Sequence, residues 1–181
     1  EQFDLAKCSK AGAKFDYVKG QWFNREYIQS ADNAVLAKDF DKILRENGIE
    51  APIEKVEAVV AMMKMKKINF IKELWPLCDF FFIAPQTFDK EDKFIRKNWK
   101  ENTADEMQQM MTVLEGIADW SAEGQKAIID PWTETTGIKP WNAWRVALVG
   151  TGQGPDMYEL SAFLGKEEVI KRMKFAIEKL G

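Results

Sequence analysis

Apolar residues recur every three or four positions along most of this chain, which is the spacing of one face of an α-helix. The clearest runs cover residues 35–44, 53–63 and 107–117. The short aromatic run DFFFIAP, residues 79–85, has the composition of a strand, but no second strand is available to pair with it. We expect it to end a helix and enter a buried loop. The pattern therefore predicts an all-α fold.

Polar residues and prolines indicate where the helices begin and end. Aspartate and serine residues suited to the N-cap position precede three of them, at Asp16, Asp32 and Ser121. Thr103 followed by Glu106 fits a capping box. Pro76 should kink or end a helix, whereas Pro155 should open one that closes at Gly165.

Aromatic and methionine side chains indicate the core. We expect Trp22, Phe23 and Tyr27 to form the buried face of the first helix. The apolar stripe from Met107 to Ile117 is more typical of a core than of a peptide-binding groove. The charged stretch 85–103 should connect two helical parts, with Trp99 packed between them.

Composition limits the classes of protein to consider. The chain has 181 residues, 46% of them hydrophobic and 30% charged, so it can bury a core without metals or disulfides. The net charge of −3 means that binding to nucleic acid would depend on local basic patches. Cys8 and Cys78 lack metal-ligand spacing, which favours a reduced, cytoplasmic protein. We find no signal peptide and no membrane span, and the absence of an initial methionine suggests a piece of a longer chain.

Histidine is absent, which removes the commonest general base and the commonest metal ligand. Neither a phosphate-binding glycine motif nor a nucleophile paired with a base occurs in the sequence. The 29 acidic residues are best interpreted as a solvated surface. We therefore predict no catalytic residue, no metal site and no cofactor for this chain.

Three stretches resemble bacterial glutamyl-tRNA synthetases, in the order and at the separations found in that family. They are SKAGAKFDYVKGQWFNREYIQ at 9–29, MKMKKINFIKELWPLCDFFF at 63–82, and RVALVGTGQGPDMYELSAFLGKEEVIKRM at 145–173. Together these stretches extend over nearly the whole chain. The resemblance is to the C-terminal, anticodon-binding region of these class I enzymes.

The resemblance implies an α-helical cage made of two helical subdomains. Residues 1–30 would end the stem-contact region, residues 31–100 would form the first subdomain, and residues 101–181 the second. The family's HIGH-like and KMSKS-like signatures, which belong to a catalytic domain that uses ATP and Mg²⁺, are missing. The expected partner is the anticodon loop of tRNA(Glu), bound by a monomer, with no role for DNA or a membrane.

The resemblance also assigns residues to anticodon bases. Arg145 matches an arginine at the entrance of a glycine-rich loop that contacts the first base, and Gly154 and Met157 match two further contacts to that base. Glycines at this loop would let the backbone turn sharply and approach a base closely. Pro155 would start a helix whose free N–H groups favour a phosphate or a base acceptor. A plain helix–helix loop with an arginine salt bridge is the alternative.

A second basic group falls near the position that contacts the third base. Lys67 replaces the arginine found in many family members, and Lys64 or Lys66 are alternatives if the alignment shifts. Helical spacing would lay the stems of these lysines over an apolar face. Lys64 and Lys66 are also candidates for phosphate contacts, as are Arg96, Lys97 and Lys100 in the connecting region. An ordinary solvated surface is the alternative for both groups.

Two other functions fit parts of the pattern. A helical protein-interaction scaffold without an RNA function would also show amphipathic helices, although no fixed repeat period is visible. A small hydrolase that uses carboxylates would need acidic residues inside the core, and the apolar stripes lack them.

Overall fold

The structure is a computed structural model that describes residues 16–181, and all regular structure in this range is helical. The predicted all-α fold is therefore confirmed for the described residues. Cys8 and residues 9–15, where the first family-like stretch begins, lie outside them. No helix in the described part of the chain is long and apolar enough to cross a membrane.

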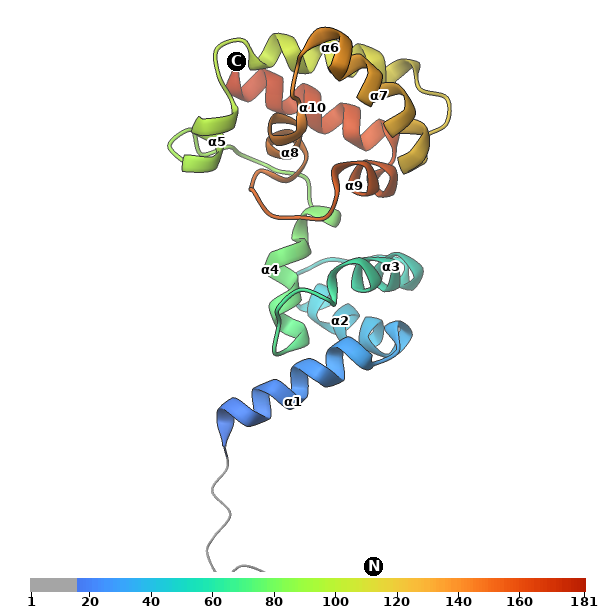
Figure 1. The fold of residues 1–181 in the computed structure, drawn as a ribbon. Coiled ribbons are helices and arrows are strands. Elements are labelled where there is room, and N and C mark those ends of the chain that lie inside the picture. Colours follow the sequence, from blue (N-terminus) through green and yellow to red (C-terminus); the bar gives the residue numbers. More distant parts are fainter. Residues whose placement is uncertain (1–15) are drawn as a thin grey trace, which may run out of the picture.

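Figure 1 shows two groups of helices, one above the other, joined through α4 and an extended segment. The lower group consists of α1 (Tyr17–Ser30), α2 (Asn33–Glu46), α3 (Ile53–Met63), the 3₁₀ turn η2 (Ile71–Leu74), α4 (Trp75–Cys78) and the 3₁₀ turn η3 (Asp79–Phe81). The upper group consists of α5 (Lys93–Asn98), α6 (Thr103–Gly116), α7 (Ala122–Thr136), α8 (Trp141–Val149), α9 (Met157–Leu164) and α10 (Lys166–Leu180).

Each group is held together by helix-on-helix packing. In the lower group α2 packs along α3, and in the upper group α10 packs against both α6 and α8 while α7 packs on α9. The methionine stripe of α6 is buried, as predicted, through Met107, Met110 and Met111. Phe81 is also buried and stacks edge-on against Phe163 of α9, with ring centroids 5.0 Å apart. This contact joins the end of the lower group to the upper one.

Short-range capping occurs at the three predicted N-caps. Asp16 accepts a hydrogen bond from Lys19 N at 3.1 Å, and Asp32 accepts one from Ala34 N at 2.9 Å. Ser121 Oγ accepts one from the third residue after it at 3.0 Å. Because these bonds depend only on residues two or three positions apart, the sequence was sufficient to predict them.

The predicted capping box of α6 is wrong by one residue. Asn102 is the N-cap, and Thr103 is already the first helical residue. The hydroxyl of Thr103 accepts a hydrogen bond from Lys100 N at 2.8 Å, so it belongs to the preceding turn. Glu106 instead accepts from the side-chain amide of Asn102 at 2.7 Å.

Two predictions made from prolines are also wrong. Pro76 lies in the first turn of α4, where its missing N–H costs no helical hydrogen bond, so it helps to begin a helix instead of ending one. Pro155 does not open α9, because Asp156 is the N-cap and the helix begins at Met157. Gly165 does end α9 as predicted, with φ of 82°.

The predicted core face of α1 is wrong. Trp22, Phe23 and Tyr27 are 51%, 56% and 57% exposed, and Ile28 is the one residue of α1 that is buried. The rings of Trp22 and Phe23, which are adjacent in the sequence, lie 4.9 Å apart. Helical spacing indicates which residues share a face, and it could not reveal that the described part of the chain leaves this face uncovered.

Candidate RNA-binding site

The guanidinium of Arg145 braces the loop that follows its own helix. Arg145 lies on α8, and its Nη2 donates to Pro155 O at 2.8 Å while its Nη1 donates to Gln153 O at 3.3 Å. No carboxylate pairs with Arg145 among the described residues. A guanidinium has five N–H groups, so three remain for another partner. The salt bridge considered as an alternative is thus absent from the described structure.

Arg145 remains a cation in this half-buried position. Burial lowers the pKa of its guanidinium, and the nearby charge of Asp156 acts in the opposite direction. An arginine starts so far above neutrality that it stays protonated. The loop therefore carries a permanent positive charge at its entrance.

Glycines let the loop lie directly on this guanidinium. Gly154 has φ of 139°, and a Cβ at this position would lie 2.6 Å from Arg145 Nη1 and 3.6 Å from the ring of Phe80. Gly150 ends α8 in the left-handed conformation, with φ of 78°. The loop turns sharply here, as the glycines predict, while Thr151, Gly152 and Gln153 at its tip are exposed.

The helix after the loop offers no free N-terminus. The carboxylate of Asp156 accepts from Tyr158 N at 2.8 Å and from Glu159 N at 3.3 Å. The expectation that open N–H groups here would favour a phosphate is therefore wrong, because a negative side chain occupies them. The order Asp156-x-x-Glu159 is itself a capping-box spacing, so the sequence contained this signal. Met157 is buried, at 4% exposure, and its side chain faces the core below the loop.

The basic residues of α5 lie beside the same loop. The ring of Phe94 reaches 3.1 Å from where a Cβ of Gly152 would be, so α5 and the loop tip are in contact. Lys97 is exposed and has no hydrogen-bond or ion-pair partner among the described residues, while Arg96 meets Glu91 in an exposed pair at 3.5 Å. Lys100 donates to Arg96 O at 2.5 Å.

Trp99 follows α5 and is not available for stacking on a base. It is 9% exposed, and its indole Nε1 donates to Gly181 O at 3.4 Å. Trp99 is therefore packed, but its bond is made to the residue after α10, in the same upper group as α5, and does not join the two groups. Phe94 was not singled out from the sequence, since its contact with Gly152 is made across 58 positions of the chain.

The second basic group forms a turn after α3. Lys64 donates from Nζ to Ala31 O at 3.0 Å, so this lysine ties the turn to the start of α2. Lys66 and Lys67 are exposed, and neither has a hydrogen-bond or ion-pair partner in the described structure. The expected helical spacing of these lysines is wrong, because α3 ends at Met63.

Side chains from α1 fix the segment that follows the lysine turn. Arg25 Nη2 donates to Asn69 Oδ1 at 2.7 Å, and Asn24 donates from its side-chain amide to Asn69 O. Asn69 N in turn donates to Glu73 at 2.8 Å. The turn is thus anchored on both sides while two ammonium groups remain in solvent.

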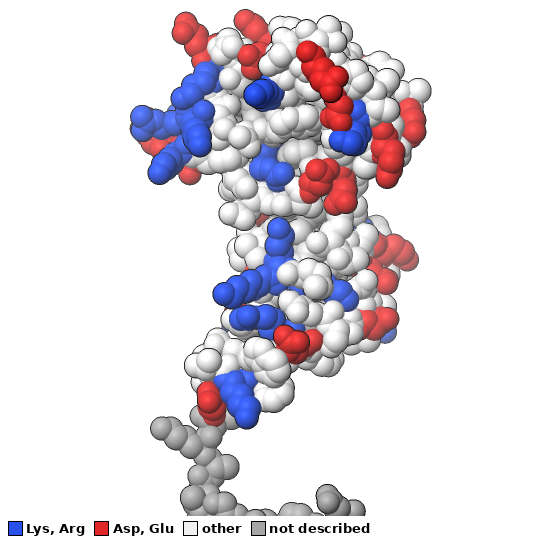
Figure 2. Space-filling view, viewed as in Figure 1, with Lys and Arg blue, Asp and Glu red and all other residues white. Residues whose placement is uncertain are grey.

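Figure 2 shows how the charges are distributed on one face of the molecule. Most of its Lys and Arg side chains lie toward the left and centre, from the α1 end up to α5, and many of the Asp and Glu side chains lie toward the right edge. The net charge of the whole chain is negative, so this face is locally more basic than the composition suggests. Such an arrangement suits a polyanion that spans both helical groups.

The described residues contain no cluster of His, Cys, Asp or Glu that could hold a metal ion. Cys78 is a buried free cysteine, and burial raises the pKa of its thiol far above the usual range. Its sulfur is therefore protonated and unreactive at neutral pH. The chemistry available at this site is hydrogen bonding and charge attraction from Arg145, the glycine loop and the lysines.

Comparison with known proteins identifies the family of this helical architecture. The family described as "Anticodon binding domain" matches residues 24–177. The chain belongs to this family. The match extends over α2 to α9, the second half of α1 and most of α10, so it includes both the lysine turn and the loop after α8.

The relatives of this anticodon-binding domain are glutamate–tRNA ligases. Those of Bacteroides thetaiotaomicron and Phocaeicola vulgatus are 49% and 48% identical over 181 residues, which is 98% of this chain and 35% of each relative. A crystal structure of a glutamate tRNA ligase from Elizabethkingia meningosepticum, in complex with its amino acid, is 37% identical with a TM-score of 0.86. It matches 99% of this chain and 36% of the solved one. The domain thus spans about a third of the length of its relatives.

Proposed function

We propose that this domain binds the anticodon loop of a glutamate tRNA as part of a glutamate–tRNA ligase. The observation that carries the proposal is the guanidinium of Arg145, which is held by two loop carbonyls and keeps three N–H groups for a ligand. The similarity to glutamate–tRNA ligases supports the choice of tRNA. In the proposed division, residues 1–30 end a stem-contact region, residues 31–100 form one subdomain and residues 101–181 the other, although α5 at the end of the first packs on α8 of the second.

Unpaired anticodon bases present their Watson–Crick edges, which is where proteins usually identify RNA sequence. A cytosine edge offers two acceptors and one donor, whereas guanine offers two donors that would oppose a cation. Arg145 would donate to the first anticodon base, with the backbone of Gly154 close beside it. Met157 would support this contact from the core side, because its side chain is buried.

The turn after α3 would meet the other end of the anticodon. Lys67 would donate to the third base, with Lys66 beside it as an alternative donor or a phosphate contact. Lys97 would bind a phosphate near the loop after α8, and Arg96 and Lys100 are further phosphate candidates. Lys64 is less available than the others because its ammonium group is already bonded to Ala31 O.

Ligation of glutamate to the tRNA with ATP would be carried out by the longer enzyme. This domain would supply recognition and no catalytic residue or cofactor ligand. We propose that it acts as a monomer in the cytoplasm. It would form no specific complex with DNA, because the 2′-hydroxyls and splayed bases of an RNA loop are what the site would contact.

Binding to transcribed tRNA tests the proposal directly. The affinity of the domain for glutamate tRNA is measured by fluorescence anisotropy at two salt concentrations, beside a transcript whose first and third anticodon bases are changed to guanine. We expect weaker binding at higher salt for both transcripts. The changed transcript should bind about thirtyfold more weakly or worse, because two base contacts of about 1–3 kcal/mol each are lost. Equal affinity for the two transcripts would show that the domain does not recognise the anticodon.

A further inference from the structure

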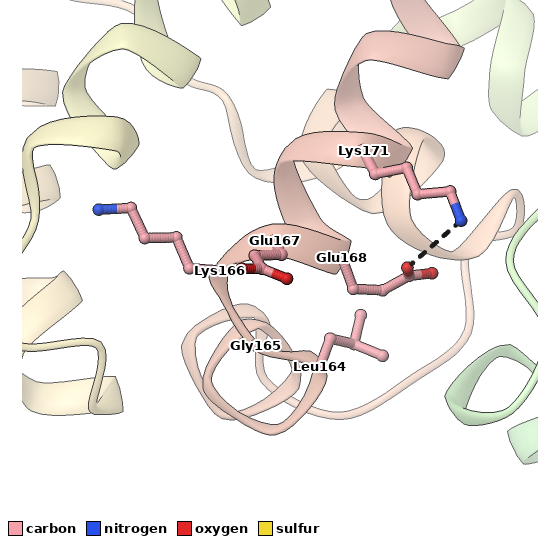
Figure 3. A pocket seen from close by; sticks show the side chains of 6 residues that line it. All are labelled: Leu164, Gly165, Lys166, Glu167, Glu168 and Lys171. Carbon is pink, nitrogen blue, oxygen red and sulfur yellow. Dashed lines mark ion pairs between the residues drawn. The ribbon is translucent and has the colours of Figure 1, made fainter.

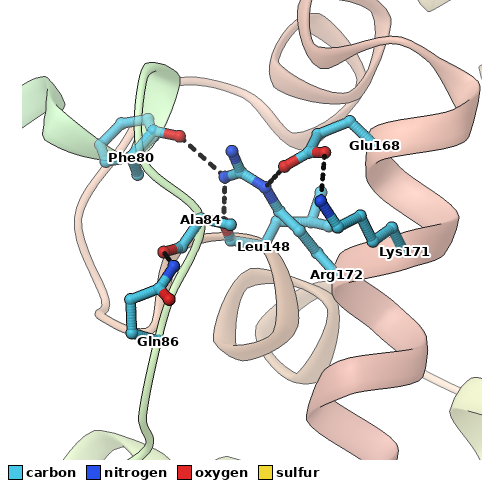
Figure 4. A network of polar contacts seen from close by, with 7 residues as sticks. All are labelled: Phe80, Ala84, Gln86, Leu148, Glu168, Lys171 and Arg172. Atoms are coloured by element: carbon cyan, nitrogen blue, oxygen red, sulfur yellow. Dashed lines mark hydrogen bonds and ion pairs between the residues drawn. The ribbon is translucent and has the colours of Figure 1, made fainter. Parts of the chain in front are cut away.

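A buried arginine joins the two helical groups behind the loop. Arg172 of α10 is 4% exposed, and its Nη1 donates to Phe80 O at 2.7 Å and to Leu148 O at 2.8 Å. Its Nε donates to Glu168 at 2.8 Å. Figure 4 shows these bonds converging on one guanidinium, which connects α10 to the segment after α4 and to the end of α8.

One nitrogen of this guanidinium has no bonding partner. Both hydrogens of Nη1 are used by the two carbonyls, and the hydrogen of Nε is used by Glu168. Nη2 makes no hydrogen bond within the described residues, and it is not among the buried unpaired atoms, so it is open to the space beside it. Arg172 lines a cleft of about 560 Å³ between the helical groups, together with Lys55, Phe82, Gln86, Phe163 and Lys171.

Lys55 faces the same cleft from α3, in the lower group. Its ammonium group lies 5.2 Å from the centre of the Phe82 ring and has no carboxylate partner in the described chain. Burial lowers the pKa of Lys55, the charge of Arg172 lowers it further, and Glu168 acts in the opposite direction. The ammonium is thus partly desolvated and near another cation, which is unfavourable unless an anion joins them.

The charges that line the cleft do not cancel. Arg172, Lys55 and Lys171 are positive and Glu168 is negative, so the formal sum is two positive charges. Glu168 is already occupied by Arg172 Nε and lies 3.9 Å from Lys171. The cleft therefore has cationic donors from both helical groups and no second carboxylate to balance them.

The beginning of α10 adds no further cation to the cleft. Figure 3 shows Lys166 pointing away from Glu168 and Lys171, which lie on the opposite side of the helix. Lys166 donates instead to Glu115 O at 2.6 Å and to Ile117 O at 2.8 Å. Its ammonium group is satisfied at the end of α6.

We infer that this cleft is a binding site for a phosphate group, held by Arg172 Nη2, Lys55 and Lys171. A phosphate dianion matches the two unbalanced charges, and guanidinium and ammonium groups are its usual donors. The occupant would connect α3 to α10 and so strengthen the junction between the helical groups. This site is separate from the proposed anticodon contacts, because none of its three donors belongs to the loop after α8 or to the lysine turn.

Titration with inorganic phosphate tests the inference on the 181-residue chain. Phosphate replaces chloride at constant ionic strength and pH, and the Nε–H resonance of Arg172 and the amides near Lys55 are followed by nuclear magnetic resonance. We expect saturable shifts that are confined to the residues around the cleft. Shifts that do not saturate, or that spread over all lysines alike, would overturn the inference.

Two lysine variants and a matched control sharpen the test. Lys55→Met and Lys171→Met keep most of the side-chain stem and remove the charge, and each should raise the apparent Kd for phosphate about tenfold. Lys38→Met removes an exposed charge from α2 and should leave the Kd unchanged. Equal Kd values in the three variants would refute the assigned site. All three variants keep the buried Arg172, so each should fold and a change in Kd can be attributed to the lost lysine charge.

The phosphate has two possible sources, a free phosphorylated molecule or the backbone of a bound RNA. The titration is therefore repeated in the presence of saturating glutamate tRNA. Unchanged phosphate binding would assign the site to a free ligand, and competitive loss of phosphate binding would assign it to the RNA backbone. Anisotropy shows separately whether the tRNA binds at all. Absence of tRNA binding would contradict the proposed function, but it would leave the phosphate titration of the cleft unaffected.

Discussion

Arg145 and Pro155 are joined by a 2.8 Å hydrogen bond from the guanidinium to a backbone carbonyl ten residues further along the chain. The bond closes the glycine-rich loop onto the helix that precedes it. The same side chain would therefore position the loop and present N–H groups to a base. A residue with two such tasks is sensitive to substitutions that preserve its charge.

Arg145→Lys should weaken binding of glutamate tRNA about tenfold, although the positive charge is retained. A lysine is a single point donor and cannot bond to both loop carbonyls while it also contacts a base in a planar arrangement. Anisotropy measurements with the transcript check this expectation. Arg45→Lys, in an exposed pair with Asp41, is the control and should bind as the unchanged chain does.

Gly154→Ala should destabilise the domain by about 1–3 kcal/mol and weaken RNA binding. The added methyl would lie 2.6 Å from Arg145 Nη1 in a backbone conformation with φ of 139°, so the guanidinium would have to move. Gly150→Ala is the matched control, because its φ of 78° also strains an alanine while the added methyl would meet Pro85 at an ordinary 3.7 Å and leave Arg145 in place. Urea unfolding and tRNA binding of both variants are compared, and a larger loss of RNA affinity in Gly150→Ala would contradict the assignment.

The two lysines of the α3 turn should respond differently to removal of their charge. Lys66→Met should reduce the slope of log affinity against log salt by about 0.7, the value for one phosphate contact to single-stranded RNA. Lys64→Met should leave the slope unchanged, since this ammonium group is bonded to Ala31 O. Binding isotherms at four salt concentrations separate these outcomes. An unchanged slope for Lys66→Met would show that Lys66 makes no phosphate contact.

The exposed aromatic face of α1 predicts a contrast in stability. Trp22→Ala should change the free energy of unfolding by no more than about 0.5 kcal/mol, because this side chain is 51% exposed. Ile28→Ala on the same helix should cost about 2–4 kcal/mol, because Ile28 is 3% exposed. Urea denaturation of the two variants measures the contrast. A comparable loss for Trp22→Ala would mean that the aromatic face is covered in solution.

Asp130 should contribute a part of the dependence of stability on pH. Bonds from Lys126 and from the Tyr158 hydroxyl hold the pKa of its carboxyl below the usual range. A carboxyl with a lowered folded pKa stabilises the fold above its unfolded pKa near 4, and this contribution is lost as the pH falls through the folded value. The difference in unfolding free energy between pH 7 and pH 3 should therefore be smaller for Asp130→Asn than for the unchanged chain. An identical difference in both proteins would show that the carboxylate does not act in this way.

Local features of the fold were predictable from the sequence, and long-range ones were not. The N-caps at Asp16, Asp32 and Ser121 depend on neighbours two or three residues away, so their residue types were sufficient evidence. The burial of the Met107 stripe followed from helical spacing in the same manner. The same spacing predicted burial of Trp22 wrongly. Spacing indicates which residues share a face of a helix, but not whether another element covers that face.

In the candidate site, too, local features were predictable from the sequence and long-range contacts were not. Arg145 and the glycines were identified by a motif that is continuous in sequence, and their loop conformation follows from glycine geometry. The contact of Phe94 with Gly152, and the bonds of Arg172 to Phe80 and Leu148, join residues that no sequence spacing relates. Asp156 is intermediate, because its capping-box spacing with Glu159 is present in the sequence, whereas Pro155 predicts a helix start one residue before the observed N-cap.

The carboxylate of Asp156 makes the loop after α8 asymmetric toward nucleotides. It neutralises the end of α9, and as an exposed anion it repels the sugar–phosphate chain from that side of the loop. If the domain binds RNA as proposed, this repulsion would favour a nucleotide whose backbone is directed toward the lysines of α5 and whose base is directed toward Arg145. The orientation of an incoming strand would thus be decided by a repulsion as well as by the attractive contacts.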